Sequence, residues 1–391
     1  MSVELAAVWI NPYTIEKSRT GGVIARLLSL CSGELVAARM FTPSRELVEK
    51  YCRLIPSKGD RESKMVREEI HSYMLNNWVS DREAKDRPRV MMLLFKGENV
   101  IQLLRCQVVG HIHKDSVSGE TVRDTYGDYI KNARGEVTYF EPAVFIIPEA
   151  LEAEATLKLW ARYSDRDGGI LFNSCQYPGT SCTEKTLVMM KPENFKGQSS
   201  LAGNVIDIIS RTGLRIIGAK IVHMSAEQAQ EFYGPVARAL PERMKPRLVE
   251  QLKKALPDIL DFSISDSVYD KLADQLKDLK GSQEFNNIIR TMTGIDPDET
   301  RGLRALRAPG KEKCLALIYQ GDHAVSRIRS VLGATDPDKA DWATIRRIYA
   351  HSISNNVAHA SDSGRNVTRE MKILMMEDND LKTIINRFYK K

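Results

Sequence analysis

Hydrophobic and polar positions follow the same order in the two halves of the chain. Each half begins with an apolar segment, continues with a helical stretch and an alternating segment, and later returns to a second apolar run. In the first half these segments are 6–10, 22–29, 35–40 and 91–95, and in the second half 186–190, 203–211, 214–222 and 315–319. Strand-like segments separated by helices predict a two-layer α/β fold with helices on one face of a small sheet. The repetition predicts two homologous domains.

The domain boundaries follow from the turn formers between the two copies. Turn formers gather at 165–169 and 177–181, which predicts a first domain at 1–165, a linker at 166–183 and a second domain at 184–391. The second copy carries an insertion at about 235–312 that is rich in helix formers. Helix-spaced leucines line it, namely Leu248, Leu252, Leu256, Leu272, Leu276 and Leu279. Arg301, Arg304 and Arg307 follow, so the insertion is either a helical cap with a solvated basic edge or a lid over a phosphate site.

Composition narrows the class of protein. With 391 residues, 42% hydrophobic and 28% charged, the chain reads as globular rather than collagen-like, disordered or disulfide-stapled. We see no apolar run of about 18 residues, no secretory signal and no regular cysteine framework, so we expect a cytoplasmic protein without a membrane partner. The net charge of +6 permits a polyanionic partner. Nucleic acid is disfavoured, because no aromatic residues interleave with the arginines of the insertion.

Candidate chemistry lies near the C-terminal end. The sequence lacks a GxxxxGK[ST] loop and a GxGxxG motif after a strand, so any phosphate would have to be held by side chains. Residues 355–363 form the densest polar group, with His359 after a short apolar pair that predicts a strand ending at the histidine. Glu370 follows in a predicted helix. A carboxylate there could hold one ring nitrogen of His359 and leave the other as a nucleophile.

These motifs resemble those of the nucleoside diphosphate kinase family. The similar segments are 186–193, 325–337, 343–346 and 355–363, in collinear order within 184–234 and 313–380. The resemblance implies two tandem ferredoxin-like α+β domains, each a four-stranded antiparallel sheet with helices, with the helical insertion in the second. It also implies transfer of the γ-phosphate of a nucleoside triphosphate to a nucleoside diphosphate, by a ping-pong reaction through a phosphohistidine.

The same resemblance assigns roles to individual residues. It makes His359 the nucleophile, Glu370 its orienting carboxylate and Ser361 a hydroxyl that fixes this arrangement. Lys191 and Asn356 would contact the sugar and phosphates, and Tyr233 would lie near the histidine. Arg329, Thr335 and Arg346 would contact the phosphates. Mg²⁺ would be held mainly by the nucleotide phosphates, without a metal site built by the protein. Two departures are Ala360, where the family has glycine, and 347–349, where it has Gly-Asp-Phe.

The first copy departs further from the family. Asn11 stands in the place of Lys191, and the segment 137–144, where the nucleophile is expected, contains no histidine. Arg105 corresponds to Arg329, whereas Arg123 is displaced by about one residue from the position of Arg346. We therefore expect a degenerate domain that pairs with the second copy inside one chain, with a homo-oligomer left open. A non-catalytic scaffold and transfer of phosphate from His359 to a protein remain alternatives.

Overall fold

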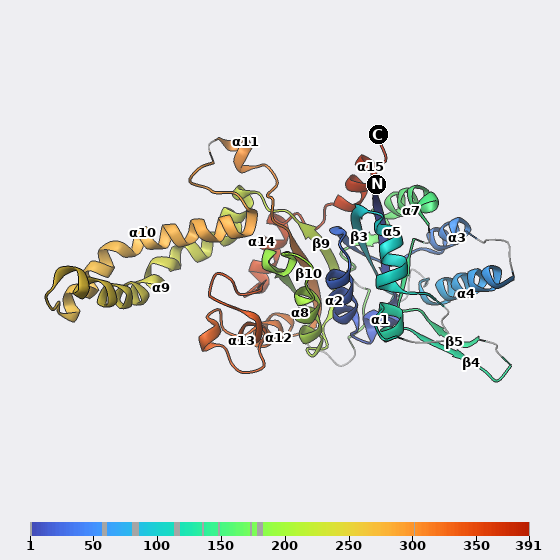
Figure 1. Cartoon of the computed structure of the whole chain (residues 1–391), viewed down its shortest axis with the longest axis horizontal. Coiled ribbons are helices and arrows are strands. Elements are labelled where there is room, and N and C mark those ends of the chain that lie inside the picture. Colours follow the sequence, from blue (N-terminus) through green and yellow to red (C-terminus); the bar gives the residue numbers. More distant parts are fainter. Residues whose placement is uncertain are drawn as a thin grey trace. The chain divides into compact units, whose positions relative to one another are not determined.

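The computed structural model of the chain divides into two compact units. One unit contains Met1–Ile221 and Leu315–Lys391, and the other contains Val222–Cys314. The structure describes residues 2–56, 61–79, 86–112, 118–134, 137–147, 149–172, 174–177, 183–300 and 302–390, with the side chains of 61–63 left aside. Figure 1 labels the helices and strands.

The first sheet is antiparallel and has the strand order β6-β1-β3-β2-β7. Its strands are β1 (Val3–Ile10), β2 (Glu34–Phe41), β3 (Val90–Glu98), β6 (Val144–Ile146) and β7 (Gly168–Gly169). A separate hairpin consists of β4 (Asp128–Lys131) and β5 (Val137–Glu141). The helical segments of this repeat are α1 (Pro12–Glu16), α2 (Thr20–Leu30), α3 (Arg45–Leu54), α4 (Arg61–Asn77), α5 (Val100–Leu103), η1 (Leu104–Val109), α6 (Val122–Tyr126) and α7 (Ala150–Tyr163). Because residues of β1 and β3 are buried almost throughout, these strands form the middle of the core.

The second sheet has the order β11-β8-β10-β9, which matches β6-β1-β3-β2 of the first. Its strands are β8 (Thr183–Met190), β9 (Arg215–Val222), β10 (Cys314–Asp322) and β11 (Ala358–Ala360). The helical segments that accompany them are η2 (Pro192–Phe195), α8 (Leu201–Ser210), α12 (Ala324–Leu332), η3 (Pro337–Lys339), α13 (Ile345–Tyr349), α14 (Gly364–Ile373) and α15 (Asp380–Phe388). Antiparallel sheets of equal order confirm the predicted fold class. The first sheet has one strand more than predicted, because β7 pairs with the end of β2.

The predicted linker begins as a bound turn rather than as a free segment. Gly168 and Gly169 pair with Phe41 and Met40 of β2, and the backbone N–H of Thr42 donates to the carbonyl of Asp167 at 2.8 Å. Residues 178–182 of the predicted linker lie outside the described residues. The residues that follow the first turn formers therefore add a strand to the sheet of the first repeat.

The two repeats contact each other through helices α2 and α8, which cross closely. A Cβ atom on Gly21 would lie 2.4 Å from the backbone nitrogen of Asp207, and one on Gly203 would lie 2.2 Å from that of Ala25. Each glycine thus faces the residue four positions after the other glycine. This reciprocal arrangement is what an approximate twofold relation between the repeats produces.

The second unit contains α9 (Ala226–Leu260), α10 (Asp266–Thr293) and α11 (Leu303–Leu306). Helix α9 is longer than predicted. The sequence predicts one helix that ends at Tyr233 and another that ends before Pro257, whereas α9 runs through both positions and contains four prolines. Each proline removes one intrahelical hydrogen bond. The helix continues because α10 packs along it, and Gly281 of α10 leaves room for Pro241.

Candidate functional site

His359 is the central residue of the short edge strand β11. It pairs with Met189 of β8, and its neighbours Ala358 and Ala360 pair with Met190 and Val188. The sequence predicts the histidine at the end of a strand, so the observed strand begins and ends later than predicted. Val357, just before the strand, has φ of 72°, a conformation that costs free energy for a β-branched residue.

A carboxylate holds the imidazole of His359. Glu370 of α14 is buried, and its Oε2 lies 3.0 Å from Nε2 of His359. The hydroxyl of Ser361 donates to the same oxygen at 2.6 Å, while Arg369 lies 3.5 Å from the other oxygen. The structure thus brings together the predicted nucleophile, its carboxylate and the nearby hydroxyl. A carboxylate on Nε2 favours the tautomer with hydrogen on Nε2 and the lone pair on Nδ1.

Three cationic side chains bind the backbone on either side of His359. Lys191 is buried and donates through Nζ to the carbonyl of Ser354 at 3.1 Å. Arg346 donates to the carbonyls of Ala358 at 3.1 Å and Gly333 at 2.9 Å. Arg329 is exposed and donates to the carbonyl of Asp362 at 3.2 Å. The three predicted cations therefore surround one stretch of backbone, 354–362.

The loop before β11 is fixed by buried polar side chains. The carboxylate of Glu193 accepts from the backbone N–H of Val357 at 2.9 Å, and the amide of Asn194 donates to the carbonyl of Val357 at 2.7 Å. The amide of Asn356 donates to the carbonyl of Ile353 at 2.8 Å. Its Oδ1 is buried and accepts no hydrogen bond from the residues that the structure describes. A buried acceptor without a donor is costly, and a ligand hydroxyl would satisfy it.

Two other predicted site residues lie on other segments of the chain. Thr335 is exposed, in the loop between α12 and η3. Tyr233 is buried in α9 of the second unit, and its role near the histidine stays a prediction. Of the basic residues of the insertion, Arg307 pairs with Glu227 at 2.9 Å, and Arg301 lies outside the described residues.

The first repeat carries different residues at the equivalent positions. Phe145 pairs with Trp9 in the way that His359 pairs with Met189, so Phe145 stands in the place of the nucleophile, just beyond the segment in which the sequence predicts it. By the same register, Ile147 replaces Ser361 and Thr156 replaces Glu370. Tyr73 and Trp78 pack against Phe145, each with its ring centroid 5.5 Å away. Aromatic side chains thus fill the region where the second repeat holds its imidazole.

A buried hydrogen-bond network replaces the lysine of the second repeat. Asn11, in the place of Lys191, donates to Glu141 at 3.2 Å and accepts from Nε1 of Trp78 at 3.2 Å. Glu141 also accepts from the hydroxyl of Tyr73 and from the backbone N–H of Ala143. Burial raises the pKa of Glu141 above its ordinary value, despite these donors. Ala143 has a positive φ of 60°, and Val357 at the equivalent position has one of 72°. In each repeat a carboxylate accepts from the backbone N–H of this left-handed residue, Glu141 from Ala143 and Glu193 from Val357.

Sequence reasoning missed this use of Glu193 and Glu141. The two glutamates occupy unrelated positions along their repeats, one after β8 and the other at the end of β5. Alignment of the two copies therefore contains no signal for a shared role. Only the left-handed conformation of Ala143 and Val357 relates them.

Comparisons with known proteins concern the second half of the chain. The family model described as nucleoside diphosphate kinase matches residues 184–254 and 308–379. The nucleoside diphosphate kinase of Staphylothermus marinus is 28% identical over 196 residues, which cover 50% of this chain and 95% of the relative. That of Rhizorhabdus wittichii is 26% identical over 189 residues, covering 48% of this chain and 91% of the relative.

Solved structures give matches over the same share of the chain. A nucleoside diphosphate kinase from Pyrobaculum aerophilum is 25% identical, covers 49% of this chain and 95% of its own, and has a TM-score of 0.33. One from Encephalitozoon cuniculi is 21% identical, covers 50% and 90%, and has a TM-score of 0.31. In the part of the chain that the structure describes, no helix is long and apolar enough to span a membrane.

Proposed function

We propose that this chain, whose second half carries a domain of the nucleoside diphosphate kinase family, transfers the γ-phosphate of a nucleoside triphosphate to a nucleoside diphosphate through His359. The observation that carries the proposal is the contact of Glu370 with both His359 and Ser361, at 3.0 and 2.6 Å. A buried carboxylate that fixes one ring nitrogen prepares the other for nucleophilic attack. The surrounding cations suit a phosphate rather than an acyl substrate.

In the first half-reaction, Nδ1 of His359 attacks the γ-phosphorus of the triphosphate. A nitrogen–phosphorus bond forms, the bond from the γ-phosphorus to the bridging oxygen breaks, and the diphosphate leaves. In the second half-reaction, a terminal oxygen of another diphosphate attacks the same phosphorus, and the nitrogen–phosphorus bond breaks. Glu370 accepts from Nε2–H throughout, and its negative charge stabilises the positive ring that forms with the phosphohistidine.

The cations stabilise charge on the transferring group. Arg329 is exposed and bound to one backbone carbonyl, so its remaining donors can turn to a phosphate. Lys191 adds a buried positive charge beside the loop 351–357. Mg²⁺ enters in this proposal as part of the substrate, bound to the phosphates of the nucleotide. The buried oxygen of Asn356 would accept from a ribose hydroxyl.

The test is phosphorylation of the purified protein with γ-labelled ATP and Mg²⁺. We expect acid-labile label on His359 that is removed by any added nucleoside diphosphate, with formation of the triphosphate. His359→Asn should abolish labelling. The matched control is His351→Asn, since His351 is exposed and lies in the same loop before β11. This control should label at the rate of the unchanged protein.

Other outcomes separate the alternatives. Label that forms on His359 but stays in the presence of every diphosphate would overturn the proposal and favour transfer to a protein. Absence of label on a folded protein would favour a scaffold without catalysis. Label on His351 instead of His359 would show that the assignment of the nucleophile is wrong.

A further inference from the structure

We infer that the first repeat, which lacks the nucleophile, positions His359 of the second repeat through the C-terminal segment 375–382, and this inference rests on the proposed function. The segment continues directly from α14, the helix that carries Glu370. It is held at both ends by charged side chains, some from each repeat. We call residues 375–382 the C-terminal latch.

The second repeat binds the beginning of the latch. Lys220 of β9 donates through Nζ to the carbonyl of Met375 and lies 3.0 Å from a carboxylate oxygen of Asp380. Its side chain is 8% exposed. Met375 has φ of 49°, which turns the chain sharply after α14. The turn directs the following residues away from the axis of the helix.

The first repeat binds the same segment through a basic residue at the position of β2 that is equivalent to Lys220 in β9. Arg39 of β2 is buried and donates to the carbonyls of Ser164 at 3.2 Å and Asp378 at 3.4 Å. Each of these basic residues lies two positions before the last residue of its strand, Arg39 before Phe41 and Lys220 before Val222. The two buried cations of the repeats therefore meet on one short piece of chain.

Side-chain contacts extend the attachment to the end of α7. The amide of Asn379 donates to Oγ of Ser164 and to the carboxylate of Asp165, both at 2.6 Å. Nζ of Lys382 lies 2.5 Å from the other carboxylate oxygen of Asp165. Hydrogen bonds from Asn379 and then Lys382 hold the pKa of Asp165 below its ordinary value. Asp165 is therefore ionised at neutral pH and holds two latch residues at once.

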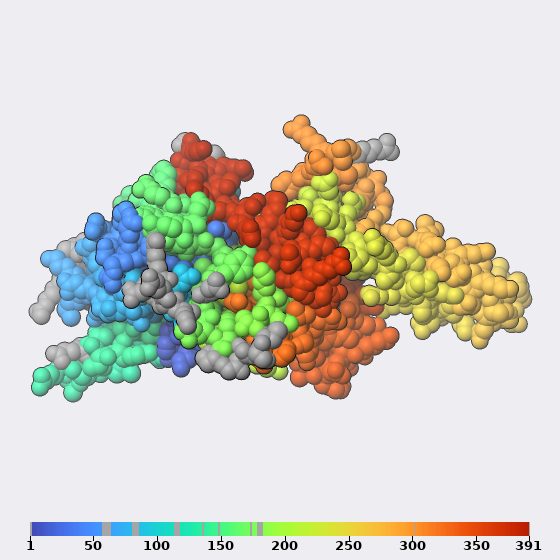
Figure 2. All heavy atoms as spheres, turned by 180° about the vertical axis from the view of Figure 1, so that it is seen from behind, coloured from blue at the N-terminus to red at the C-terminus, as the bar shows by residue number. Residues whose placement is uncertain are grey.

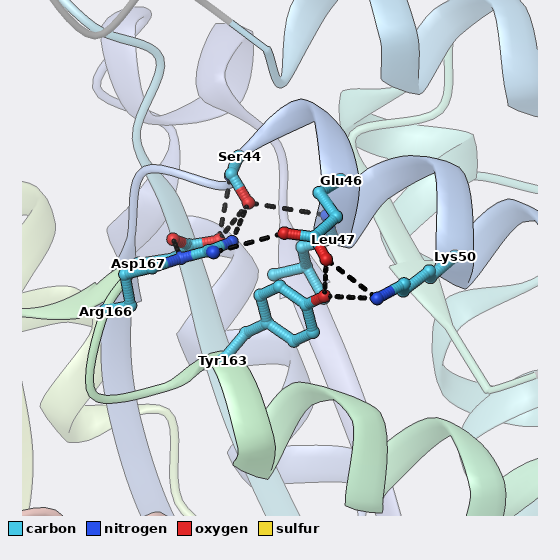
Figure 3. A network of polar contacts seen from close by, with 7 residues as sticks. All are labelled: Ser44, Glu46, Leu47, Lys50, Tyr163, Arg166 and Asp167. Carbon is cyan, nitrogen blue, oxygen red and sulfur yellow. Dashed lines mark hydrogen bonds and ion pairs between the residues drawn. The ribbon is translucent and has the colours of Figure 1, made fainter.

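The turn that receives the latch is itself fixed by a polar network on α3. Ser44, which caps α3, binds Asp167 through its hydroxyl at 2.5 Å and through its backbone N–H at 3.0 Å. Arg166 bridges Asp167, Ser44 and Glu46, and Tyr163 donates to Glu46 at 2.6 Å. Figure 3 shows these side chains turned toward one another between α3 and the end of α7. The latch thus binds a surface that is already rigid.

Apolar packing follows the polar contacts. Leu381 and Ile385 of α15 are buried, and α15 packs on α7 and β2 of the first repeat. In Figure 2 the last residues of the chain, drawn in red, lie against the green atoms of α7. The free energy from this burial keeps the latch in place. Since α14 ends where the latch begins, a shift of the latch would move Glu370 relative to His359.

The test removes the contacts of the latch and leaves the site residues unchanged. Asn379→Ala with Lys382→Ala deletes the bonds to Ser164 and Asp165. The matched control is Asn386→Ala with Arg387→Ala, which removes an amide and a basic side chain from α15, where no side-chain hydrogen bond of theirs is found in the described structure. We expect the latch variant to be phosphorylated about tenfold to a hundredfold more slowly, with KM for the triphosphate within about twofold. The control should match the unchanged protein.

A second measurement needs no nucleotide. Nitrogen NMR of the histidine rings should show the Nε2–H tautomer of His359 in the unchanged protein and a mixture of tautomers in the latch variant. Asp165→Ala should give the same mixture, and combining it with Lys382→Ala should add little, because both remove one contact. An unchanged tautomer in a folded latch variant would overturn the inference. If the unchanged protein takes no phosphate, the proposed function fails, and the tautomer alone decides whether the latch positions the ring.

Discussion

Arg123 and Arg346 make the same two hydrogen bonds in the two repeats. Arg346 donates to the carbonyls of Gly333 and Ala358, and Arg123 donates to those of Gly110 and Val144, at distances between 2.7 and 3.1 Å. Each arginine lies 13 residues after its glycine. The displacement of one residue along the sequence is therefore taken up before Gly110, and the two arginines occupy equivalent places in the fold.

A π-helical turn accounts for the apparent displacement. Asn99 and His323 both precede their helices in the left-handed conformation, and Gly110 and Gly333 both follow them with positive φ. Between these markers the first repeat has one residue more, which it accommodates in the π-helix η1. A π-turn has i→i+5 hydrogen bonds and so takes up one extra residue within a helix. Arg123 is thereby returned to the position of Arg346.

The shared bonds predict that Arg123 stabilises the fold. Arg123→Met would leave two buried carbonyls without a donor, so we expect the free energy of unfolding to fall by about 2–4 kcal/mol. Urea unfolding measures this. Arg105→Met is the control, since Arg105 is partly exposed in a 3.8 Å pair with Glu149, and should cost less than about 1 kcal/mol. Equal losses of stability in the two variants would contradict the stabilising role of Arg123. Arg346→Met should lower both stability and the rate of phosphorylation.

Glu370→Gln should slow phosphorylation of His359 by about a hundredfold or more, because an amide no longer fixes the ring with a negative charge. Ser361→Ala should slow phosphorylation by about tenfold, because the carboxylate loses one hydrogen bond. Rapid-quench measurement of the label gives both rates. Glu250→Gln, at an exposed position of α9, is the control. Rates for Glu370→Gln close to those of this control would refute the orienting role.

Gly21→Ala should destabilise the contact between the repeats. Its Cβ would lie 2.4 Å from the backbone of α8, so the helices would have to separate, at a cost of about 1–3 kcal/mol or more. Gly364→Ala is the opposite case, because this first residue of α14 has open space around its Cβ and alanine favours helix by up to about 1 kcal/mol. Thermal unfolding of both variants checks the difference in sign. A Gly21→Ala variant as stable as the unchanged protein would mean that α2 and α8 do not approach so closely.

Glu141 should make stability depend on pH. Its pKa is raised in the folded protein, so the folded state binds the proton more tightly than the unfolded state. The free energy of unfolding should therefore fall as pH rises from about 4, the ordinary pKa of glutamate, to the higher pKa of the folded state. Urea midpoints between about pH 4 and 8 measure the slope. Glu141→Gln should remove this contribution, and an identical slope in the variant would contradict the assignment.

Ala360→Gly should leave the rate of phosphorylation unchanged. Ala360 stands where the family has glycine, but it lies in β11, pairs with Val188 and is not among the residues with positive φ. Glycine would only add conformational freedom to the unfolded chain, which lowers the free energy of unfolding by about 0.5–1 kcal/mol. Labelling and urea unfolding of the variant test both statements. A faster variant would show that the methyl group does hinder the site.

The strands and the nucleophile segment of this protein could be predicted from local pattern. Segments such as 6–10 and 315–319 are buried runs whose apolar character holds wherever they pack. His359, Ser361 and Glu370 lie close along the chain, on one strand, directly after it and on the next helix, so their proximity needs only local geometry. For that reason the sequence could bring His359 and Glu370 together without knowledge of the rest of the fold, whereas Ser361 was assigned through the family resemblance.

Contacts between distant segments were decided by the tertiary structure alone. The sequence determined that the chain contains two copies of one fold and that the second keeps the histidine. It did not determine that Phe145 takes the place of His359, that η1 restores the register of Arg123, or that Arg39 and Asp165 bind residues near the C-terminus. Those relations depend on strand pairing and on charged side chains that bind groups more than 200 residues away along the chain. Such pairings depend on how the whole core packs, which no local pattern contains.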